Sequence, residues 1–169
     1  MRILLTSDLH LSHKAICKYR DVFATSAEHD EYVLSEIEKL TKRDILFILG
    51  DFLFDSADYD AYMDRLNKTK CRIKLVMGNH DSTKLYKEPR FEMQLPLFSF
   101  KNMWVSHCPI HPGELRGRLL NIHGHLHKEV IPDKRYFNVN LDANDYKFVE
   151  IEAIRERASS IQQNNDNTV

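Results

Sequence analysis

The sequence predicts an α/β fold with added α+β character in its second half. Three apolar runs of strand length, at residues 2–7, 44–49 and 71–77, alternate with segments that have helical patterns. This alternation is typical of parallel strands joined by right-handed helical crossovers. From about residue 97 the chain instead carries short strand patterns separated by turn residues, so we expect a second group of strands there.

The composition indicates a globular domain. The 169 residues are 43% hydrophobic and 29% charged, and 24 Lys and Arg residues stand against 25 Asp and Glu, for a formal net charge of −1. A long nucleic acid is therefore not an expected partner, because such binding usually shows as a basic excess. No apolar run approaches the roughly 20 residues that span a membrane, so no membrane partner is expected either.

The cysteines and the first residues predict a cytoplasmic protein. Cys17, Cys71 and Cys108 are odd in number and scattered, which argues for a reducing compartment and against a disulfide framework. The chain also reaches Asp8 too early for the apolar core of a signal peptide.

The first strand is followed directly by two candidate metal ligands. It ends at Asp8-Leu9-His10. Alternate residues of an extended segment point to the same side, so Asp8 and His10 can aim at one point, as a two-ligand metal arm requires. The alternative is a solvated loop in which the pair is accidental.

Two helices are expected in the first half. Thr25 and Glu28 have the spacing of a capping box, which predicts a helix from there to about Leu40. His29 falls in its first turn, on the polar side, where we expect it to be exposed and without a role. A second helix is expected over residues 57–67, with Asp55 as a candidate for its cap.

The second and third strands also end in polar motifs. These are Gly50-Asp51 and Gly78-Asn79-His80-Asp81, and in each the glycine permits a sharp exit from the strand. Open α/β sheets place their ligands in the crevice at such strand ends. Taken alone, Gly50-Asp51 has the alternative interpretation of an ordinary turn with a solvated carboxylate.

The second half supplies further histidines. A hairpin is predicted over residues 97–106 with Lys101-Asn102 as its turn, because Asn102 can adopt the left-handed conformation that such a turn needs. The hairpin leads into His107. A strand over residues 119–122 then ends at the motif His123-Gly124-His125-Leu126-His127.

A single domain is expected over residues 1–158. Two more strands at 136–139 and 147–151 and a short helix to about Ala158 complete it. The segment 159–169 is polar and without a pattern, so we predict a disordered tail.

The strand exits together supply a set of oxygen and nitrogen ligands. Seven such ligands are too many for one ion and suit two ions, if one carboxylate bridges them. Donors of these kinds favour Mn, Fe, Zn or Ni over Ca, and no thiolate belongs to the set. The alternative, scattered surface histidines, does not explain why they follow strands. The set is Asp8, His10, Asp51, Asn79, His107, His125 and His127.

The order of these motifs resembles the calcineurin-like metallophosphoesterase superfamily, in particular its compact bacterial and phage-type members. The resemblance extends from Asp8 to His127. It implies a four-layer αββα sandwich of two mixed β-sheets flanked by helices. It also implies a dimetal site at the strand-exit loops.

The resemblance also implies a role for each residue. One metal would be held by Asp8, His10, Asp51 and His127. The other would be held by Asp51, Asn79, His107 and His125, so that Asp51 bridges. The two cofactor ions are divalent, with Mn as the first expectation and Fe, Zn, Ni or Mg as alternatives. His80 would contact the scissile phosphate as a catalytic residue, and Asp81 would orient it.

The implied activity is phosphoester hydrolysis. A hydroxide that bridges the metals would attack a small or nucleotide substrate, and we expect a phosphodiesterase more than a phosphomonoesterase because no cap domain is left over. Phosphoprotein substrates are not expected, since residues 50–56 lack the Gly-Asp-x-x-Asp-Arg-Gly motif of protein phosphatases. The alternatives are a catalytically silent scaffold of the same fold and a nuclease acting on nucleic-acid ends. Homo-oligomers are compatible with all three.

Further residues are candidates for substrate contact. His13 follows the first ligand pair, and His111 lies in a Pro/Gly-rich loop. Arg116 and Arg118 flank a glycine in that loop, and guanidinium groups suit phosphate, although ordinary surface arginines are the alternative. Phe52 and Phe54 follow Asp51, where they either stack on a base or pack in the core. His123 is expected to support the loop that precedes His125.

Overall fold

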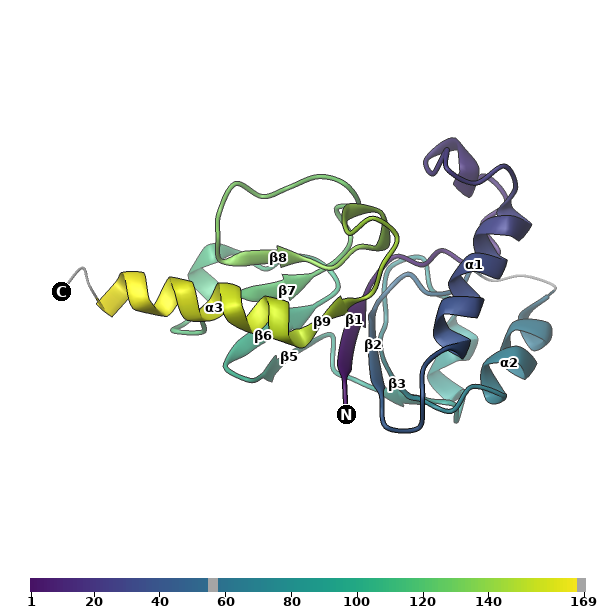
Figure 1. Cartoon of the computed structure of the whole chain (residues 1–169), viewed down its shortest axis with the longest axis horizontal. Coiled ribbons are helices and arrows are strands. Elements are labelled where there is room, and N and C mark those ends of the chain that lie inside the picture. Colours follow the sequence, from purple (N-terminus) through teal and green to yellow (C-terminus); the bar gives the residue numbers. More distant parts are fainter. Residues whose placement is uncertain (55–57, 167–169) are drawn as a thin grey trace.

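The computed structural model describes residues 1–54 and 58–166, with side chains through residue 163. Asp55, the candidate helix cap, lies outside the described residues. Within the described part, no helix is long and apolar enough to cross a membrane. Two mixed sheets, each accompanied by helices, form the architecture, which confirms the predicted fold class (Figure 1).

The first sheet has five strands in the order β4-β3-β2-β1-β9. Its first four strands in the chain run parallel to one another, and β9 pairs antiparallel with β1. The three predicted strands form its centre, whereas the sequence did not predict β4. The strands are β1 (Ile3–Thr6), β2 (Ile45–Leu49), β3 (Arg72–Val76), β4 (Phe91–Met93) and β9 (Val149–Glu150).

The second sheet has four strands in the order β5-β6-β7-β8. The hairpin is confirmed, because β5 and β6 pair antiparallel and both turn residues, Lys101 and Asn102, have positive φ, 50° and 62°. The pairs β6–β7 and β7–β8 are parallel. The strands are β5 (Leu97–Phe100), β6 (Met103–Ser106), β7 (Asn121–His123) and β8 (Tyr136–Asn138).

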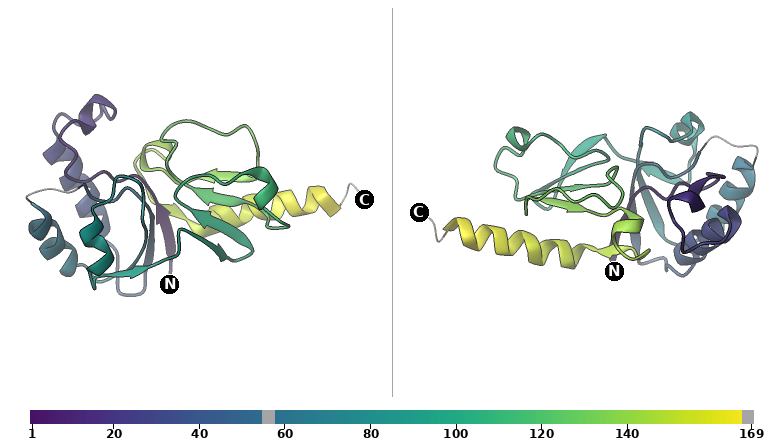
Figure 2. Two further views of the ribbon diagram at one scale, coloured as in Figure 1. Left: turned by 180° about the vertical axis from the view of Figure 1, so that it is seen from behind. Right: turned by 90° about the horizontal axis from the view of Figure 1, so that it is seen from above.

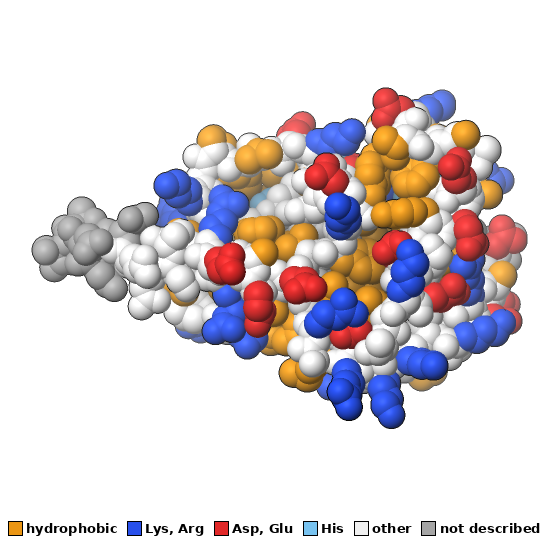
Figure 3. All heavy atoms as spheres, viewed as in Figure 1, with side chains coloured by type: hydrophobic (Ala, Val, Ile, Leu, Met, Phe, Trp, Pro, Cys, Tyr) orange, Lys and Arg blue, Asp and Glu red, His pale blue; other side chains and the backbone are white. Residues whose placement is uncertain are grey.

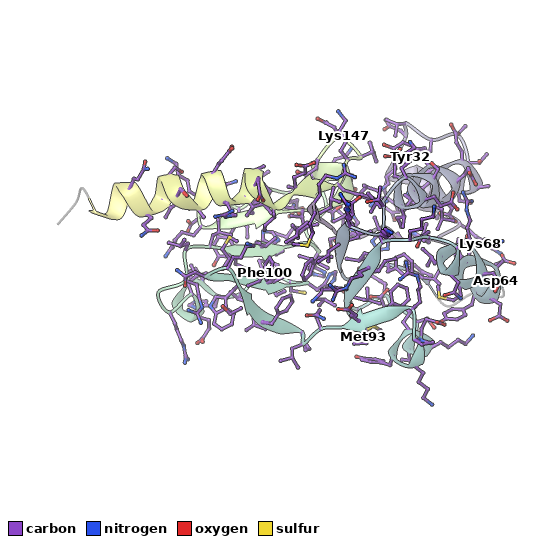
Figure 4. The ribbon with its side chains drawn as sticks, turned by 60° about the horizontal axis from the view of Figure 1, so that its bottom comes forward. Tyr32, Asp64, Lys68, Met93, Phe100 and Lys147 are labelled. Carbon is purple, nitrogen blue, oxygen red and sulfur yellow. The ribbon has the colours of Figure 1, made fainter. Side chains whose placement is uncertain are left out.

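Two helices cover the face of the first sheet that points away from the second sheet (Figures 1 and 2). They are α1 (Ser26–Glu38) and α2 (Tyr59–Asn67). The predicted cap of α1 is confirmed, since Thr25 Oγ1 accepts a hydrogen bond from the Glu28 N–H at 3.1 Å. In Figure 4, Tyr32 on α1 lies close to Lys147, and the Tyr32 hydroxyl donates to the Tyr146 carbonyl at 2.9 Å.

The core follows the alternation of side chains along the strands. In β2, Leu46 and Ile48 belong to the apolar cluster that includes α1 and α2, whereas Phe47 and Leu49 belong to the cluster between the two sheets. The Phe47 ring lies 5.2 Å from the Phe100 ring of β5, centroid to centroid. Both faces of the first sheet are therefore buried, as its continuous apolar strands predict.

The C-terminal helix differs from its prediction. The segment 159–166, predicted as part of a disordered tail, is helical, because α3 runs over Ile151–Asp166. Residues 167–169 lie outside the described part. In α3, Ile154, Ala158 and Ile161 are buried in the cluster between the sheets, at the spacing of one helix face. This apolar stripe, overlooked in a polar background, holds the helix along the second sheet (Figure 2).

Candidate metal centre

The register of the first sheet brings the predicted site residues together. Thr6 of β1 pairs with Ile48 of β2, so the two strands end side by side. Beyond the strands the pairing continues between the exit loops, where the Asp8 N–H donates to the Gly50 carbonyl at 2.9 Å. The first and second ligand motifs are thus fixed against each other by backbone hydrogen bonds.

Most of the predicted ligands lie on unusual backbone. Asp8, His10, Asp51, His125 and His127 all have φ between 50° and 68°. Residues other than glycine rarely adopt this left-handed region, and each such residue costs on the order of 1–3 kcal/mol. Strain of this kind, concentrated at one place, is typical of a functional site.

Two glycines are required by the close packing around these ligands. Gly50 has φ +90°, and a Cβ there would lie 2.3 Å from Nδ1 of His107. A Cβ on Gly124 would lie 2.5 Å from Oδ2 of Asp8. No other residue type fits at either position without moving a predicted ligand, which gives a physical reason for the Gly-Asp and Gly-His motifs.

Asp51 lies between two groups of ligand atoms. Its Oδ2 is 3.8 Å from Nε2 of His10 on one side and 3.6 Å from Nε2 of His107 on the other. Its Oδ1 accepts a hydrogen bond from the His80 N–H at 2.8 Å. One carboxylate oxygen is therefore fixed by the backbone, while the other faces both groups at once.

The first group consists of Asp8, His10 and His127. Asp8 Oδ1 lies 3.8 Å from Nε2 of His10 and 3.9 Å from Nε2 of His127. Asp8 Oδ1 and both ring nitrogens of His10 are buried and have no hydrogen-bond partner in the described part of the chain. Buried polar atoms are normally paired, so this group fits a bound cation.

The electrostatics of the first group favour the metal-binding form of His10, whereas the pKa of Asp8 is shifted the other way. Burial, together with the positive charge of Arg20, lowers the pKa of His10 to about 2, which keeps the imidazole neutral and its lone pair available. Burial raises the pKa of Asp8, while a hydrogen bond from Ser7 opposes that shift. A neighbouring cation would keep such a buried carboxylate ionised.

The second group contains His107, His125 and, unexpectedly, Cys108. His107 Nδ1 donates to the Leu49 carbonyl at 2.7 Å, which leaves Nε2 as the ligand atom. Asn79 Oδ1 lies 2.9 Å from that Nε2. No thiolate was predicted in the set, but the Cys108 sulfur lies within 4.8 Å of ligand nitrogens of His107 and His125.

His80 and Asp81 have separate surroundings. His80 is exposed, and its ring centroid lies 5.8 Å from that of His10. The expectation that Asp81 orients His80 is corrected by the structure. The Asp81 carboxylate instead accepts hydrogen bonds from backbone N–H groups at 2.6–3.1 Å, and no bond to the His80 ring is seen among the described residues. The donors are Gly78, Asp51, Phe52 and Leu53.

A buried network behind the first group was missed in the sequence. Arg20 is completely buried and donates to the carbonyls of Asp8 and Leu9. Its Nε lies 3.4 Å from Oδ2 of Asp142, and the same oxygen lies 3.3 Å from Nδ1 of His127. The hydrogen bond between His127 and Asp142 raises the pKa of His127. Arg20 and Asp142 thus position ligands from opposite ends of the chain.

His29 is another correction. It was expected on the exposed face of α1, but it is fully buried. Its Nε2 lies 2.8 Å from Nη1 of Arg20, and its Nδ1 lies 2.8 Å from Oδ1 of Asp30. A histidine in the first turn of a helix looks polar-facing by periodicity, and only the neighbouring loop that carries Arg20 covers it.

The four candidates for substrate contact separate into two groups. His13 lies beside the centre and lines a cleft with His10 and His80. The other three are not among the described residues that line this cleft, and their substrate contacts stay predictions. His111 accepts a hydrogen bond from the Gly113 N–H at 3.1 Å, Arg116 pairs with Glu114 at 2.9 Å, and Arg118 lies over the Trp104 ring.

The remaining predictions concern support and packing. His123 is buried, and its Nδ1 lies 2.8 Å from the Gly124 carbonyl, as expected for a residue that supports the loop. Phe52 is fully buried and packs on Phe91, so it belongs to the core. Phe54 is only half-buried and faces the cleft.

Several proteins resemble this chain in sequence. The Gene 66 protein of Mycobacterium phage D29 is 29% identical, over 95% of this chain and 98% of its own length. One component of the nuclease SbcCD of Escherichia coli K12 is 32% identical over 53% of this chain, which corresponds to only 24% of that component. A probable cyclic nucleotide phosphodiesterase of Coxiella burnetii is 30% identical over 50% of this chain and 34% of its own length.

The fold has a counterpart among solved structures. A protein of unknown function from Aquifex aeolicus superposes with a TM-score of 0.71 at 24% identity, covering 92% of this chain and 98% of its own. A family model described as calcineurin-like phosphoesterase matches residues 1–164. Members are dimetal-dependent hydrolases that act on phosphoester bonds, and the ligand groups described above could hold such ions. The chain therefore belongs to the calcineurin-like phosphoesterase family.

Proposed function

We propose that this protein is a phosphodiesterase for small or nucleotide substrates and that it works with two divalent ions, of which Mn is the first candidate. The observation that carries the proposal is the position of Asp51, whose Oδ2 faces His10 at 3.8 Å and His107 at 3.6 Å. A carboxylate shared in this way suits two ions rather than one. Asp8, His10 and His127 would complete one site, and Asn79, His107 and His125 the other.

The bound ions would supply a pair of Lewis acids and lower the pKa of water, so that hydroxide is available near neutral pH. Residues of the chain would then position the substrate and supply the proton. The His80 N–H bond to Asp51 ties the position of this histidine to the shared carboxylate. From the exposed mouth of the site, its ring can donate a proton to a phosphoryl oxygen or to the leaving oxygen.

Diester substrates are favoured by the openness of the site. His80 and Asn79 are exposed, and the described residues 1–54 and 58–166 form no separate cap over them. Enclosing a small dianionic monoester would call for such a cover or for basic side chains. We propose accordingly that one domain, acting in the cytoplasm, carries the whole site.

A nuclease acting on nucleic-acid ends is the second candidate, supported by the similarity to the SbcCD component over half of this chain. The net charge of −1 argues against long nucleic acids. Figure 3 shows acidic and basic side chains interspersed over much of the face that it presents, with basic side chains gathered along the lower edge. A silent scaffold is disfavoured because His80 and all seven predicted ligands are present in the sequence.

The test uses metal-free protein with and without added Mn. Three substrates are compared: bis-p-nitrophenyl phosphate, p-nitrophenyl phosphate and a short oligonucleotide. We expect Mn-dependent hydrolysis with the highest kcat/KM on the diester, and elemental analysis of the protein as purified identifies the native ions. A preference for the oligonucleotide would favour the nuclease, and no hydrolysis of any substrate would favour the scaffold.

A further inference from the structure

A cleft of about 410 Å³ adjoins the first ligand group. This volume lies in the range of small-molecule sites, about 300–1,000 Å³. One side of the cleft is the candidate centre, and the other side is built from the half-buried Phe54 and the segment around η1 (Ile16–Lys18). The lining residues are His10, His13, Ile16, Tyr19, Phe54, His80, His127 and Asp142.

The far side of the cleft is a series of stacked rings. The Phe54 ring stacks on His80 with centroids 5.2 Å apart and planes at 16°. It also stacks on His13 at 4.7 Å and 8°. His13 in turn faces Tyr19 at 6.4 Å and 21°. The series therefore leads from the proposed catalytic histidine outward to the mouth of the cleft.

The outer end of this series is exposed although it is aromatic. Tyr19 retains 67% of its accessible surface, whereas the apolar Ile16 beside it is only 1% exposed. The segment with η1 lies beyond the start of α1, as the purple segment at the top right of Figure 1. An exposed aromatic ring next to a buried apolar side chain offers a surface on which another flat ring can stack.

The charges of the cleft define what it can accept. None of its described lining residues is Lys or Arg. A second phosphate would therefore find no cationic partner on the far side, whereas a flat neutral ring would find the exposed ring of Tyr19 to stack on. The contrast with Phe52 is informative, because that ring is fully buried and Phe54, two residues later, is turned into the cleft.

We propose that this cleft binds the nucleobase of a nucleoside phosphoester whose phosphorus lies at the metal centre. The inference rests on the proposed phosphodiesterase function and specifies its substrate class. The base stacks on the exposed ring of Tyr19, because Phe54 is already stacked on both His80 and His13, and the sugar extends across the cleft toward the metal centre. An aliphatic phosphoester reaches the same centre but leaves this surface uncovered.

The test compares two esters that react at the same phosphorus environment: adenosine 2′,3′-cyclic phosphate and methyl riboside 2′,3′-cyclic phosphate, which lacks the base. Stacking of one base is worth about 1–3 kcal/mol, which corresponds to roughly a 5- to 150-fold preference. We therefore expect kcat/KM of the Mn-loaded protein to be at least about tenfold higher for the adenosine ester. Tyr19→Ala should reduce this ratio toward one.

Tyr86→Ala is the matched control, because Tyr86 is also exposed, at 62%, and lies outside the cleft. It should leave the ratio unchanged. An active enzyme with equal kcat/KM for both esters would overturn the inference, and so would equal ratios in the Tyr19→Ala and Tyr86→Ala proteins. Either result leaves the phosphodiesterase proposal standing.

Calorimetry with adenosine alone separates the two proposals if neither ester is hydrolysed. In that case the proposed function fails, while adenosine binding remains measurable. Binding to the unmodified protein that is weakened about tenfold by Tyr19→Ala, and not by Tyr86→Ala, supports the base site. The absence of adenosine binding, or equal binding by both variants, overturns it.

Discussion

The two halves of the candidate centre differ in how their ligand atoms are satisfied. In the first half, Asp8 and His10 are 0% and 4% exposed, and Asp8 Oδ1 and both His10 ring nitrogens lack hydrogen-bond partners among the described residues. In the second half, Asn79 is exposed and lies 2.9 Å from His107 Nε2. Because His107 Nδ1 donates to the Leu49 carbonyl, its Nε2 is an acceptor, and the two side chains form a hydrogen bond when the Asn79 amide turns its NH₂ group toward the ring.

This difference indicates which half of the centre is stabilised more by a bound ion. Each buried polar atom without a partner costs about 1–3 kcal/mol, and a cation in the first half would relieve that cost. In the second half the Asn79 amide can satisfy His107 Nε2 by turning its NH₂ group toward the ring, and a cation must displace that bond. We infer that the first half binds its ion more tightly and contributes more to the stability of the folded protein.

The largest expected effect comes from the residue that both halves share. Asp51→Asn removes the charge facing His10 and His107, so both ions should be lost together and kcat/KM should fall at least about 1,000-fold, beyond the usual effect of one transition-state donor. Elemental analysis and steady-state rates check this. A variant that keeps two ions and its full rate would show that Asp51 does not bridge.

His80 belongs to neither half, and its removal should separate binding from turnover. His80→Ala should keep the metal content of the unmodified protein but lower kcat by about 10²–10⁴-fold, the range for a lost general acid. Its backbone N–H to Asp51 is retained in this variant. Loss of metal along with rate would instead place His80 among the ligands.

Arg20 supports the first half alone. Removing one partner of a buried charged pair typically costs about 3–5 kcal/mol, and Arg20→Met removes the guanidinium that contacts Asp142 and the Asp8 carbonyl. We expect the free energy of unfolding to fall by about 3 kcal/mol, measured by urea denaturation. Arg65→Met is the control, because Arg65 pairs with Glu31 and Glu38 at the partly exposed surface and should cost less than about 1 kcal/mol.

The positions of Arg20 and its partners in the sequence explain why this network could not be predicted from the sequence. Strand exits were predictable because parallel strands end at one edge, and the register Thr6 to Ile48 brings Asp8 beside Gly50 as expected. The hairpin turn at Asn102 was predictable from local conformation. Arg20 lies in a stretch without periodicity, and its partners are backbone carbonyls and a carboxylate 122 residues away. Such contacts exist only after folding.

The same distinction applies to the C-terminal helix and to Asp81. A stripe of three apolar residues in α3 is weak as a pattern and becomes decisive only when two sheets offer a surface to cover. Asp81 follows His80, which favoured a pairing between neighbours. The fold instead brings the backbone N–H groups of the Asp51 loop within 2.6–3.1 Å of the Asp81 carboxylate. These backbone groups provide more hydrogen-bond donors than a single imidazole ring could.

The smallest effect tests the comparison of the halves most directly. Breaking one hydrogen bond costs about 0.5–1.5 kcal/mol, so Mn should bind in two steps whose dissociation constants differ by at least about two- to tenfold. Calorimetric titration of metal-free protein should show the tight step lost in His10→Ala and retained in His107→Ala. Thermal unfolding should follow the same order, with the melting temperature rising mainly during the first step. If His107→Ala abolished the tight step instead, the second half would bind Mn more tightly. The unpaired buried atoms of Asp8 and His10 would then not determine the order of binding.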